Sequence, residues 1–141
     1  MTTIVCDRKT MVADKRASGD TLFLTTKIFR INNSLIGFSG NIEQALRFME
    51  WRRSPDTKPC FDGGFQCEVI ELSACGALTW WGAEMVGIKI ENDHYAIGSG
   101  SQFALGAMAM GASPAKAIKI AARWDGATGS EIQTMTLKAG K

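Results

Sequence analysis

The stretch that decides the fold is the first one, Met1-Thr2-Thr3-Ile4-Val5-Cys6-Asp7, an apolar run with polar residues at both ends. It has neither the basic start nor the long apolar segment of a secretory signal, so we expect residue 1 to be the true end of the protein. Removal of Met1 would leave Thr2 with a free α-amine. That amine can act as general base for the hydroxyl of the same residue, which makes Thr2 a candidate nucleophile.

Length and composition favour one globular domain spanning residues 1–141. Hydrophobic residues make up 45% of the chain, charged residues 21%, and the formal net charge is +2. Lys and Arg are spread singly or in pairs, so nucleic acid is not an expected partner. No apolar run approaches the roughly 18 residues of a membrane span. We therefore expect a cytoplasmic protein that does not enter a membrane.

The cysteines and the single histidine do not predict a metal site or another cofactor. Cys6, Cys60, Cys67 and Cys75 include no close CxxC pair of the kind that binds zinc, and we expect them to be reduced thiols. His94 has no companion motif for a serine or cysteine triad and is predicted to lie at a strand end or a turn.

Hydrophobic periodicity predicts an α+β fold with antiparallel sheets and helices on their faces. Asn32-Asn33 is predicted to turn a hairpin because asparagine tolerates positive φ, and Asn41 is predicted to cap the first helix. Residues 15–21 and 54–64 are predicted loops. The predicted elements are strands over 3–7, 11–14, 26–31 and 35–39, a helix from 41 to about 53, strands over 66–72, 77–81, 85–90 and 94–97, helices over 102–110 and 114–124, and a strand over 131–137.

An N-terminal nucleophile needs a buried cation, a carboxylate that holds this cation, and an oxyanion hole. Alternation places Lys27 on the side of Phe29 and Ile31, so its ammonium is predicted to face an interior, with Asp14 as the nearest partner. Gly40 directly precedes a predicted helix, where its N–H and the helix N-terminus could stabilise an oxyanion. Taken singly, each residue has an ordinary alternative: a surface carboxylate, a snorkelling lysine or a turn glycine.

Together these features resemble the proteasome β-subunit and the bacterial HslV peptidase, members of the N-terminal nucleophile hydrolases. The resemblance runs from Thr2 to about Leu46 and from about Glu68 to about Met135. The matching segments are Thr2-Thr3-Ile4-Val5, the Ala-Asp-x-Arg-Ala-Ser segment from Ala13 to Ser18, Lys27 before its strand, Ser39-Gly40 before the first helix, the Gly98-Ser99-Gly100 turn, and Asp125 with Thr128-Gly129.

The resemblance implies a four-layer αββα sandwich of two antiparallel sheets and a threonine endopeptidase that uses no cofactor. The peptide bond would be cleaved through an acyl-enzyme ester. The implied catalytic residues are Thr2 as nucleophile, Asp14 and Lys27 as the ion pair that tunes it, Gly40 as the oxyanion hole, and Ser99 and Asp125, which would hold the terminal amine.

The resemblance also implies that the substrate is a peptide or an unfolded protein that adds along a strand edge. Ser18 would bind the backbone of this substrate. The residues implied to surround the first specificity pocket are small or apolar, which predicts an uncharged, apolar residue before the scissile bond. They are Ala17, Thr25, Phe29, Phe38, Ile42 and Leu46.

The chain departs from this family between Gly40 and Gln66, where it offers one helix and a loop instead of two long helices. We therefore expect a shortened first helical layer. The family implies a homo-oligomer, as a ring or a related assembly, and an ATPase unfoldase as a possible partner. Two other functions remain open: a non-catalytic assembly subunit that keeps the fold, and an amidase of the same superfamily acting on a small amide.

Overall fold

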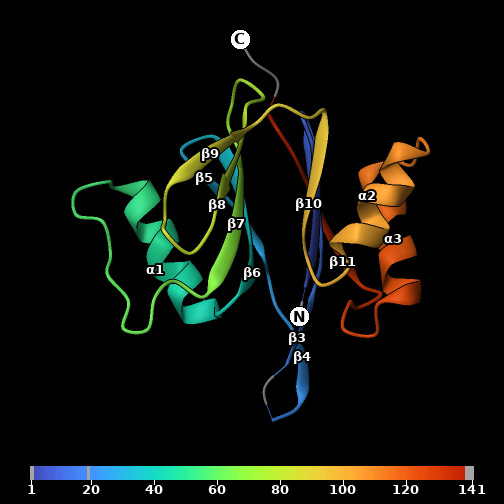
Figure 1. Ribbon diagram of the computed structural model, residues 1–141, viewed down its shortest axis with the longest axis horizontal. Coiled ribbons are helices and arrows are strands. Elements are labelled where there is room, and N and C mark those ends of the chain that lie inside the picture. Colours follow the sequence, from blue (N-terminus) through green and yellow to red (C-terminus); the bar gives the residue numbers. More distant parts are fainter. Residues whose placement is uncertain (1, 19, 139–141) are drawn as a thin grey trace.

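The computed structural model describes residues 2–18 and 20–138, which form eleven strands and three helices (Figure 1). In chain order they are β1 (Thr3–Asp7), β2 (Thr10–Asp14), β3 (Arg16–Ser18), β4 (Leu22–Leu24), β5 (Ile28–Ile31), β6 (Ser34–Gly40), α1 (Ile42–Arg53), β7 (Cys67–Leu72), β8 (Leu78–Trp81), β9 (Gly87–Ile90), β10 (His94–Gly98), α2 (Ser101–Ala109), α3 (Pro114–Trp124) and β11 (Ile132–Thr136).

Two antiparallel sheets face each other and carry helices on their outer faces (Figure 1). One sheet has the order β10-β1-β2-β11 and is covered by α2 and α3, whereas the other has the order β5-β6-β7-β8-β9 and is covered by α1. This arrangement confirms the predicted αββα sandwich. Among the described elements α1 is alone on its face, as expected for a shortened helical layer.

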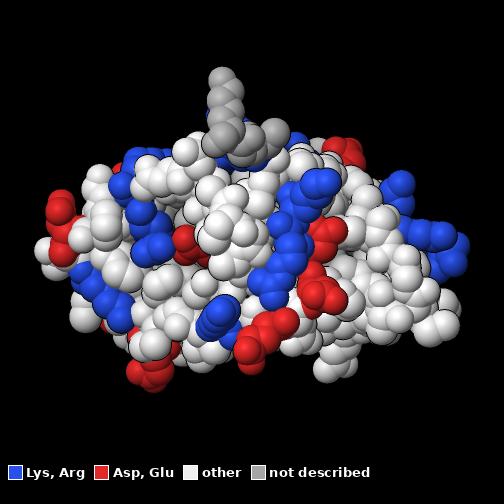
Figure 2. All heavy atoms as spheres, turned by 90° about the horizontal axis from the view of Figure 1, so that it is seen from above, with Lys and Arg blue, Asp and Glu red and all other residues white. Residues whose placement is uncertain are grey.

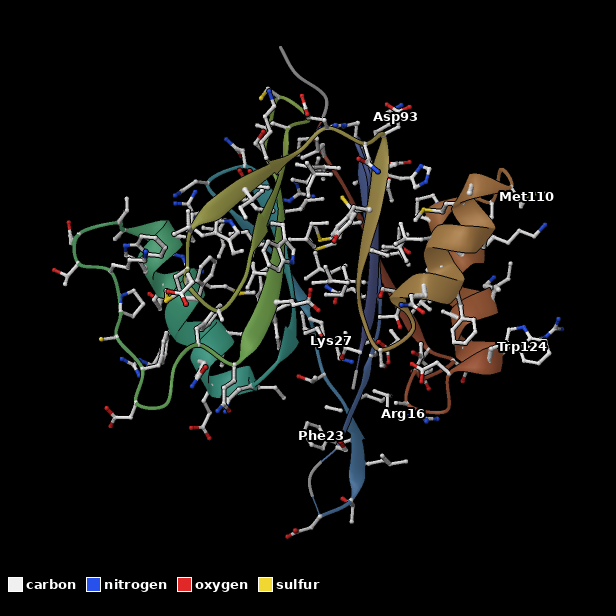
Figure 3. All side chains as sticks on the ribbon, in the orientation of Figure 1. Arg16, Phe23, Lys27, Asp93, Met110 and Trp124 are labelled. Atoms are coloured by element: carbon white, nitrogen blue, oxygen red, sulfur yellow. The ribbon has the colours of Figure 1, made fainter. Side chains whose placement is uncertain are left out.

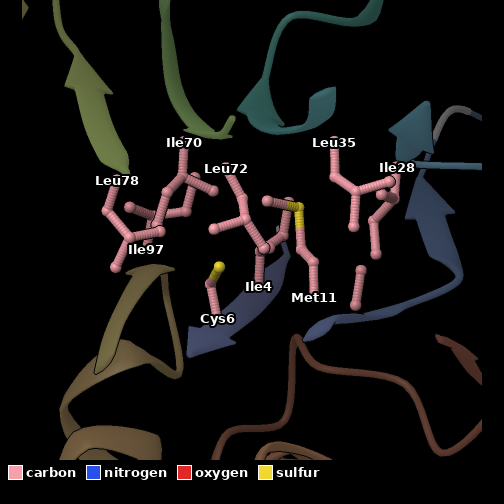
Figure 4. Packing of buried hydrophobic residues seen from close by; sticks show 10 residues of the cluster. Ile4, Cys6, Met11, Ile28, Leu35, Ile70, Leu72, Leu78 and Ile97 are labelled. Atoms are coloured by element: carbon pink, nitrogen blue, oxygen red, sulfur yellow. The ribbon is translucent and has the colours of Figure 1, made fainter. Parts of the chain in front are cut away.

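Three apolar cores separate the four layers. Ile4 of β1 and Leu35 of β6 belong to the core between the two sheets, which Figure 4 shows from close by. Phe48 packs α1 against the five-stranded sheet, and Ile118 packs α3 against the other. All four side chains are fully buried. Because β1 and β2 face the inter-sheet core on one side and α2 and α3 on the other, their ends are rigidly placed.

Most predicted elements are confirmed, with differences at short strands and at strand starts. Asn32 and Asn33 have φ of 51° and 66°, as predicted for the hairpin turn. The segment predicted as a loop over 15–21 instead contains β3, which pairs with β4. Strands of three residues are too short for alternation to reveal them. The predicted strand over 26–31 begins only at Ile28, so Lys27 lies just before it.

The surface carries charges of both signs side by side. On the face shown in Figure 2, basic and acidic residues are neighbours and do not form separate regions. Within the described part of the chain, every helix is too short or too polar to cross a bilayer.

Candidate active site

Thr2 is held at the end of the central strands of one sheet. Its carbonyl accepts a hydrogen bond from Ser99 N (2.9 Å), and the next residue, Thr3, donates its N–H to Asp14 Oδ1 (2.9 Å). Gly98 has a φ of 97°, and a Cβ there would lie 1.7 Å from the carbonyl oxygen of Thr2. Only glycine therefore fits where β10 passes Thr2. Met1, whose removal would free the amine of Thr2, lies outside the described residues.

A buried ion pair lies directly beside Thr2. The Lys27 ammonium is 3.3 Å from Asp14 Oδ1, and the two residues are 2% and 0% exposed. The same ammonium also donates hydrogen bonds to Thr2 Oγ1 and to the carbonyl oxygen of Arg16. The second carboxylate oxygen of Asp14 accepts from Gly129 N (2.9 Å). A cation that reaches from the edge of one sheet to β2 of the other is thus aimed at the threonine hydroxyl.

The buried environment of Lys27 shifts the pKa of its ammonium. Burial lowers the pKa of the Lys27 ammonium below its ordinary value, and the Arg16 charge acts in the same direction, while Asp14 opposes both. A positive charge in contact with Thr2 Oγ1 favours the negatively charged form of that oxygen. The arrangement can therefore activate a hydroxyl nucleophile.

Gly40 ends β6 and is followed by Asn41, the N-cap of α1. Phe38 N donates to Lys27 O (3.3 Å), so N–H groups of alternate residues on β6, including Gly40, point to the β5 side. Because β5 begins only at Ile28, the N–H of Gly40 points past its end. The φ of Gly40 is 121°, and a Cβ there would lie 2.3 Å from Gln66 O, so no other residue fits.

These groups share one cavity of about 480 Å³. Figure 3 shows Arg16 and Lys27, two of its lining residues, where the projecting β3–β4 hairpin meets the sandwich. The cavity brings together a hydroxyl, a cation and a backbone N–H at the start of α1. It is lined by Thr2, Arg16, Ala17, Ser18, Lys27, Phe38, Gly40, Asn41, Ile42 and Glu43.

A chain of hydrogen bonds connects the neighbourhood of Thr2 to the loop after α3. Ser99 Oγ and Thr128 Oγ1 both donate to Asp125 Oδ2, each at 2.6 Å. Thr128 Oγ1 is 2.7 Å from Thr3 Oγ1, which also accepts from Gly100 N (3.0 Å). Burial opposes a charge on Asp125, but the two hydroxyl donors hold the pKa of this carboxyl below its ordinary value.

Some residues in this environment were not among the sequence-predicted site residues. Thr3 and Thr128 complete the hydrogen-bond chain, and Arg16 and Glu43 line the cavity. The Thr128-Gly129 pair after the last helix was the available signal for Thr128. Arg16 lies on a strand that periodicity did not reveal, and the sequence pattern gave no reason to single out Glu43, a polar residue on an amphipathic helix.

The predicted substrate-binding residues divide into two groups. Ala17, Ser18, Phe38 and Ile42 line the cavity, whereas Thr25, Phe29 and Leu46 do not. Phe29 packs into the core beneath α1, and Leu46 lines a separate hollow of about 510 Å³ beside Trp51. Leu46 lies one turn of α1 beyond Ile42, which does line the cavity.

No family model matches the chain, and no curated protein matches it either. Solved structures do. HslV from Trypanosoma brucei has a TM-score of 0.78 at 23% identity, with 97% of this chain and 99% of that chain covered. BPH from Thiobacillus denitrificans has a TM-score of 0.75 at 19% identity, with 97% of each chain covered. The structure of the same protein in complex with epoxomicin has a TM-score of 0.74 at 19% identity, with 99% of each chain covered.

The chain has the HslV fold. This confirms at the level of fold the resemblance predicted from the sequence, and it agrees with the four layers of the N-terminal nucleophile hydrolases. The structural likeness to HslV covers 97% of the chain and so extends beyond the motif segments on which the resemblance was based. The comparison concerns the fold, so the chemistry of the cavity has to be argued from the side chains described above.

Proposed function

We propose that the chain is a threonine endopeptidase whose nucleophile is Thr2 Oγ1. The observation that carries this proposal is the contact of the buried Lys27 ammonium with Thr2 Oγ1 while it is paired with Asp14. A structural ion pair would not need to direct its cation at a hydroxyl in the wall of a cavity. The HslV fold and the epoxomicin complex of a protein with the same fold support the proposal.

The reaction would begin once Met1 has been removed and the nitrogen of Thr2 is an amine. This amine takes the proton of Thr2 Oγ1, directly or through water, while Oγ1 attacks the carbonyl carbon of the scissile bond. The Lys27 ammonium stabilises the developing charge on Oγ1. Ser99 and Asp125 are proposed to keep the amine in place, since Ser99 N already binds the carbonyl of Thr2.

The tetrahedral intermediate carries its negative charge on the former carbonyl oxygen, which the Gly40 N–H would stabilise. Its collapse breaks the C–N bond, and the protonated Thr2 amine gives its proton to the leaving amine. The acyl group is left as an ester on Thr2. Water then attacks this ester with the amine again accepting a proton, which releases the new carboxylate and restores Thr2.

An extended peptide is the substrate that suits this cavity. Ser18 on β3 and Asn41 after β6 line it from two sides, so a peptide backbone could add between these segments as a further strand. Ala17, Phe38 and Ile42 contribute the apolar part of the lining and are proposed to surround the side chain before the scissile bond.

We also propose that the chain acts as a homo-oligomer, in a ring or related assembly. The β3–β4 hairpin projects from the sandwich, and its residues Leu22, Phe23 and Leu24 are all exposed (Figure 3). A two-stranded hairpin with apolar side chains on both faces is marginally stable in water, and contact with a second copy would bury them. A cytoplasmic location and an unfoldase partner complete the proposal. All four cysteines are free thiols, which is compatible with a reducing compartment.

Intact mass after treatment with epoxomicin tests the peptidase proposal. This probe is an epoxyketone, and its two electrophilic groups suit a hydroxyl and an amine on one residue. We expect protein that has lost Met1 to gain the mass of one probe, and Thr2→Ala to gain none. Thr2→Ser should react, since it keeps both groups, and Thr21→Ala, an exposed threonine outside the cavity, should react like the wild type.

The alternatives give different results in the same experiment. A non-catalytic assembly subunit would show no adduct even after loss of Met1, and it would cleave no peptide. An amidase for small amides would react with a small amide substrate and leave peptides intact. The oligomer is tested separately by light scattering: Phe23→Ser should lower the molar mass of the assembly if the hairpin lies between copies.

A further inference from the structure

The cavity beside Thr2 contains one carboxylate whose role is unassigned. Of its lining residues, Arg16, Lys27 and Glu43 are charged. The Lys27 ammonium is bound to Thr2, Asp14 and a carbonyl, and Arg16 Nη1 donates to Gly126 O (3.0 Å). Both cations are therefore held by the protein itself. Across residues 2–18 and 20–138, Glu43 takes part in no side-chain hydrogen bond or ion pair.

The position of Glu43 on α1 favours a negative charge at this place. Asn41 caps the helix by accepting a hydrogen bond from Gln44 N (3.0 Å), and Glu43 lies in the first turn. The positive end of the helix dipole stabilises an anion there. The adjacent Gln44 is different, because its amide binds Gly64 O and Gln66 N and so fixes the following loop. Glu43 alone in this turn offers a charged group to the cavity.

The neighbouring wall of the cavity suits the stem of a long side chain. Phe38 is buried at one side, and Ile42 directly precedes Glu43. A lysine or arginine of the substrate can lay its methylene groups along such apolar surface while its charged end reaches a carboxylate. An apolar side chain would fill the same wall but leave the carboxylate without a partner.

We infer that Glu43 is a specificity-determining residue that selects a lysine or arginine before the scissile bond. The inference rests on the proposed peptidase function, and it replaces the expectation of an uncharged residue at this position. The ion pair between substrate and enzyme would form at the open side of the cavity, since Glu43 is exposed. We therefore expect a preference of a few-fold to about tenfold, which falls as salt is added.

Matched peptide substrates that differ only in the residue before the scissile bond test this inference. With the processed wild-type assembly, kcat/KM should be higher for lysine than for norleucine, and lowest for glutamate. Glu43→Gln should lower the lysine-to-norleucine ratio about fivefold, and Glu43→Lys should make glutamate the better substrate. Glu50→Gln, on the same helix but outside the cavity lining, should keep the wild-type ratio.

The outcomes separate this inference from the function on which it rests. If the wild type cleaves the peptides and Glu43→Gln keeps its lysine-to-norleucine ratio, Glu43 does not set specificity and the peptidase proposal stands. If the wild type cleaves no peptide and gains no epoxomicin adduct, both fall. Epoxomicin labelling of each variant shows that its nucleophile is intact, so a changed ratio cannot come from a misfolded site.

Discussion

Two ion pairs in this molecule, one fully buried and one partly buried, differ in their geometry. Asp14–Lys27 makes one contact of 3.3 Å with side-chain exposures of 0% and 3%, and Lys27 also reaches Thr2. The side chains of Arg52 and Glu71 are more exposed, at 28% and 11%. Arg52 nevertheless donates two parallel hydrogen bonds of 3.1 and 3.0 Å to the Glu71 carboxylate. Arg52 binds both oxygens of its partner, whereas Lys27 divides its donors among several acceptors.

The difference indicates what each pair is for. The guanidinium of Arg52 connects α1 to β7 and lies over the ring of Trp81, 5.0 Å from its centroid. A planar, bidentate group of this kind fixes one geometry. An ammonium is a compact charge whose pKa shifts easily on burial, which suits a group that must stabilise charge on a neighbouring hydroxyl. The first pair thus fits catalysis and the second fits structure.

The largest expected effect is the loss of activity in Lys27→Met, which keeps the length of the side chain but removes its charge. We expect kcat/KM to fall about 10²- to 10⁴-fold, because stabilisation of the nucleophile oxygen is lost. Arg52→Met should stay within a few-fold of the wild type. Peptide cleavage measures both, and circular dichroism confirms that each variant is folded. Equal losses in the two variants would erase the distinction between the pairs.

Stability should separate the pairs in a second way. Asp14→Asn leaves the Lys27 cation buried without its counterion, and it also weakens the bonds to Thr3 N and Gly129 N. Breaking a buried pair in this way costs about 3–5 kcal/mol of unfolding free energy. Glu71→Gln, in the more exposed pair, should cost about 1–2 kcal/mol. Urea unfolding monitored by tryptophan fluorescence gives both values, and the reverse order would contradict the burial argument.

The pH dependence follows from the direction of the Lys27 shift. Burial lowers the folded-state pKa of this ammonium below 10.5, so between that lowered pKa and 10.5 the unfolded chain binds more protons than the folded one. The contribution of Lys27 to stability should therefore rise with pH across this window, level off above 10.5 and be lost as the pH falls to the folded pKa. Activity should decline over the same window, since Lys27 loses its charge.

A pH series of kcat/KM and of urea midpoints checks both trends. The acidic limb of activity should follow the amine of Thr2, whose ordinary pKa is about 7.7–8.0. Lys27→Met should lack the alkaline rise in stability. Activity that stays constant up to the ordinary lysine pKa would show that the ammonium is not as strongly perturbed as its burial indicates.

The sequence predicted those features that are determined by residues close together in the chain. The hairpin turn at Asn32-Asn33, the cap at Asn41 and the strand formed by the apolar run of β1 could all be predicted because each depends on neighbouring residues. The αββα layers followed from the resemblance, and the structural comparisons confirm them. Hairpin geometry named Asp14 as the partner of Lys27, and the two do pair, but across the two sheets: Asp14 ends β2 in one sheet, and Lys27 directly precedes β5 in the other.

What could not be predicted depends on contacts between distant segments. The cavity is lined by residues of β3, the end of β6 and the first turn of α1. Hydrophobic periodicity cannot predict that Glu43 and Arg16 line the same cavity. Thr128 is 125 positions from Thr3, so its hydroxyl contact becomes visible only when the last loop folds back on β1. The resemblance implied that Leu46 is a pocket residue, but this side chain lines another hollow beside α1.

The smallest expected effect comes from a third ion pair, which extends the comparison to the surface. Glu50 and Arg53 lie three positions apart on α1, with side-chain exposures of 72% and 49%. Water screens such a pair and both side chains lose freedom in forming it, so its net contribution is close to zero. We expect Glu50→Gln to leave both the urea midpoint and peptide cleavage unchanged. If this exposed pair instead mattered as much as Glu71 and Arg52, then burial would not be what ranks the three pairs, and the assignment of Lys27 would rest on its contact with Thr2 alone.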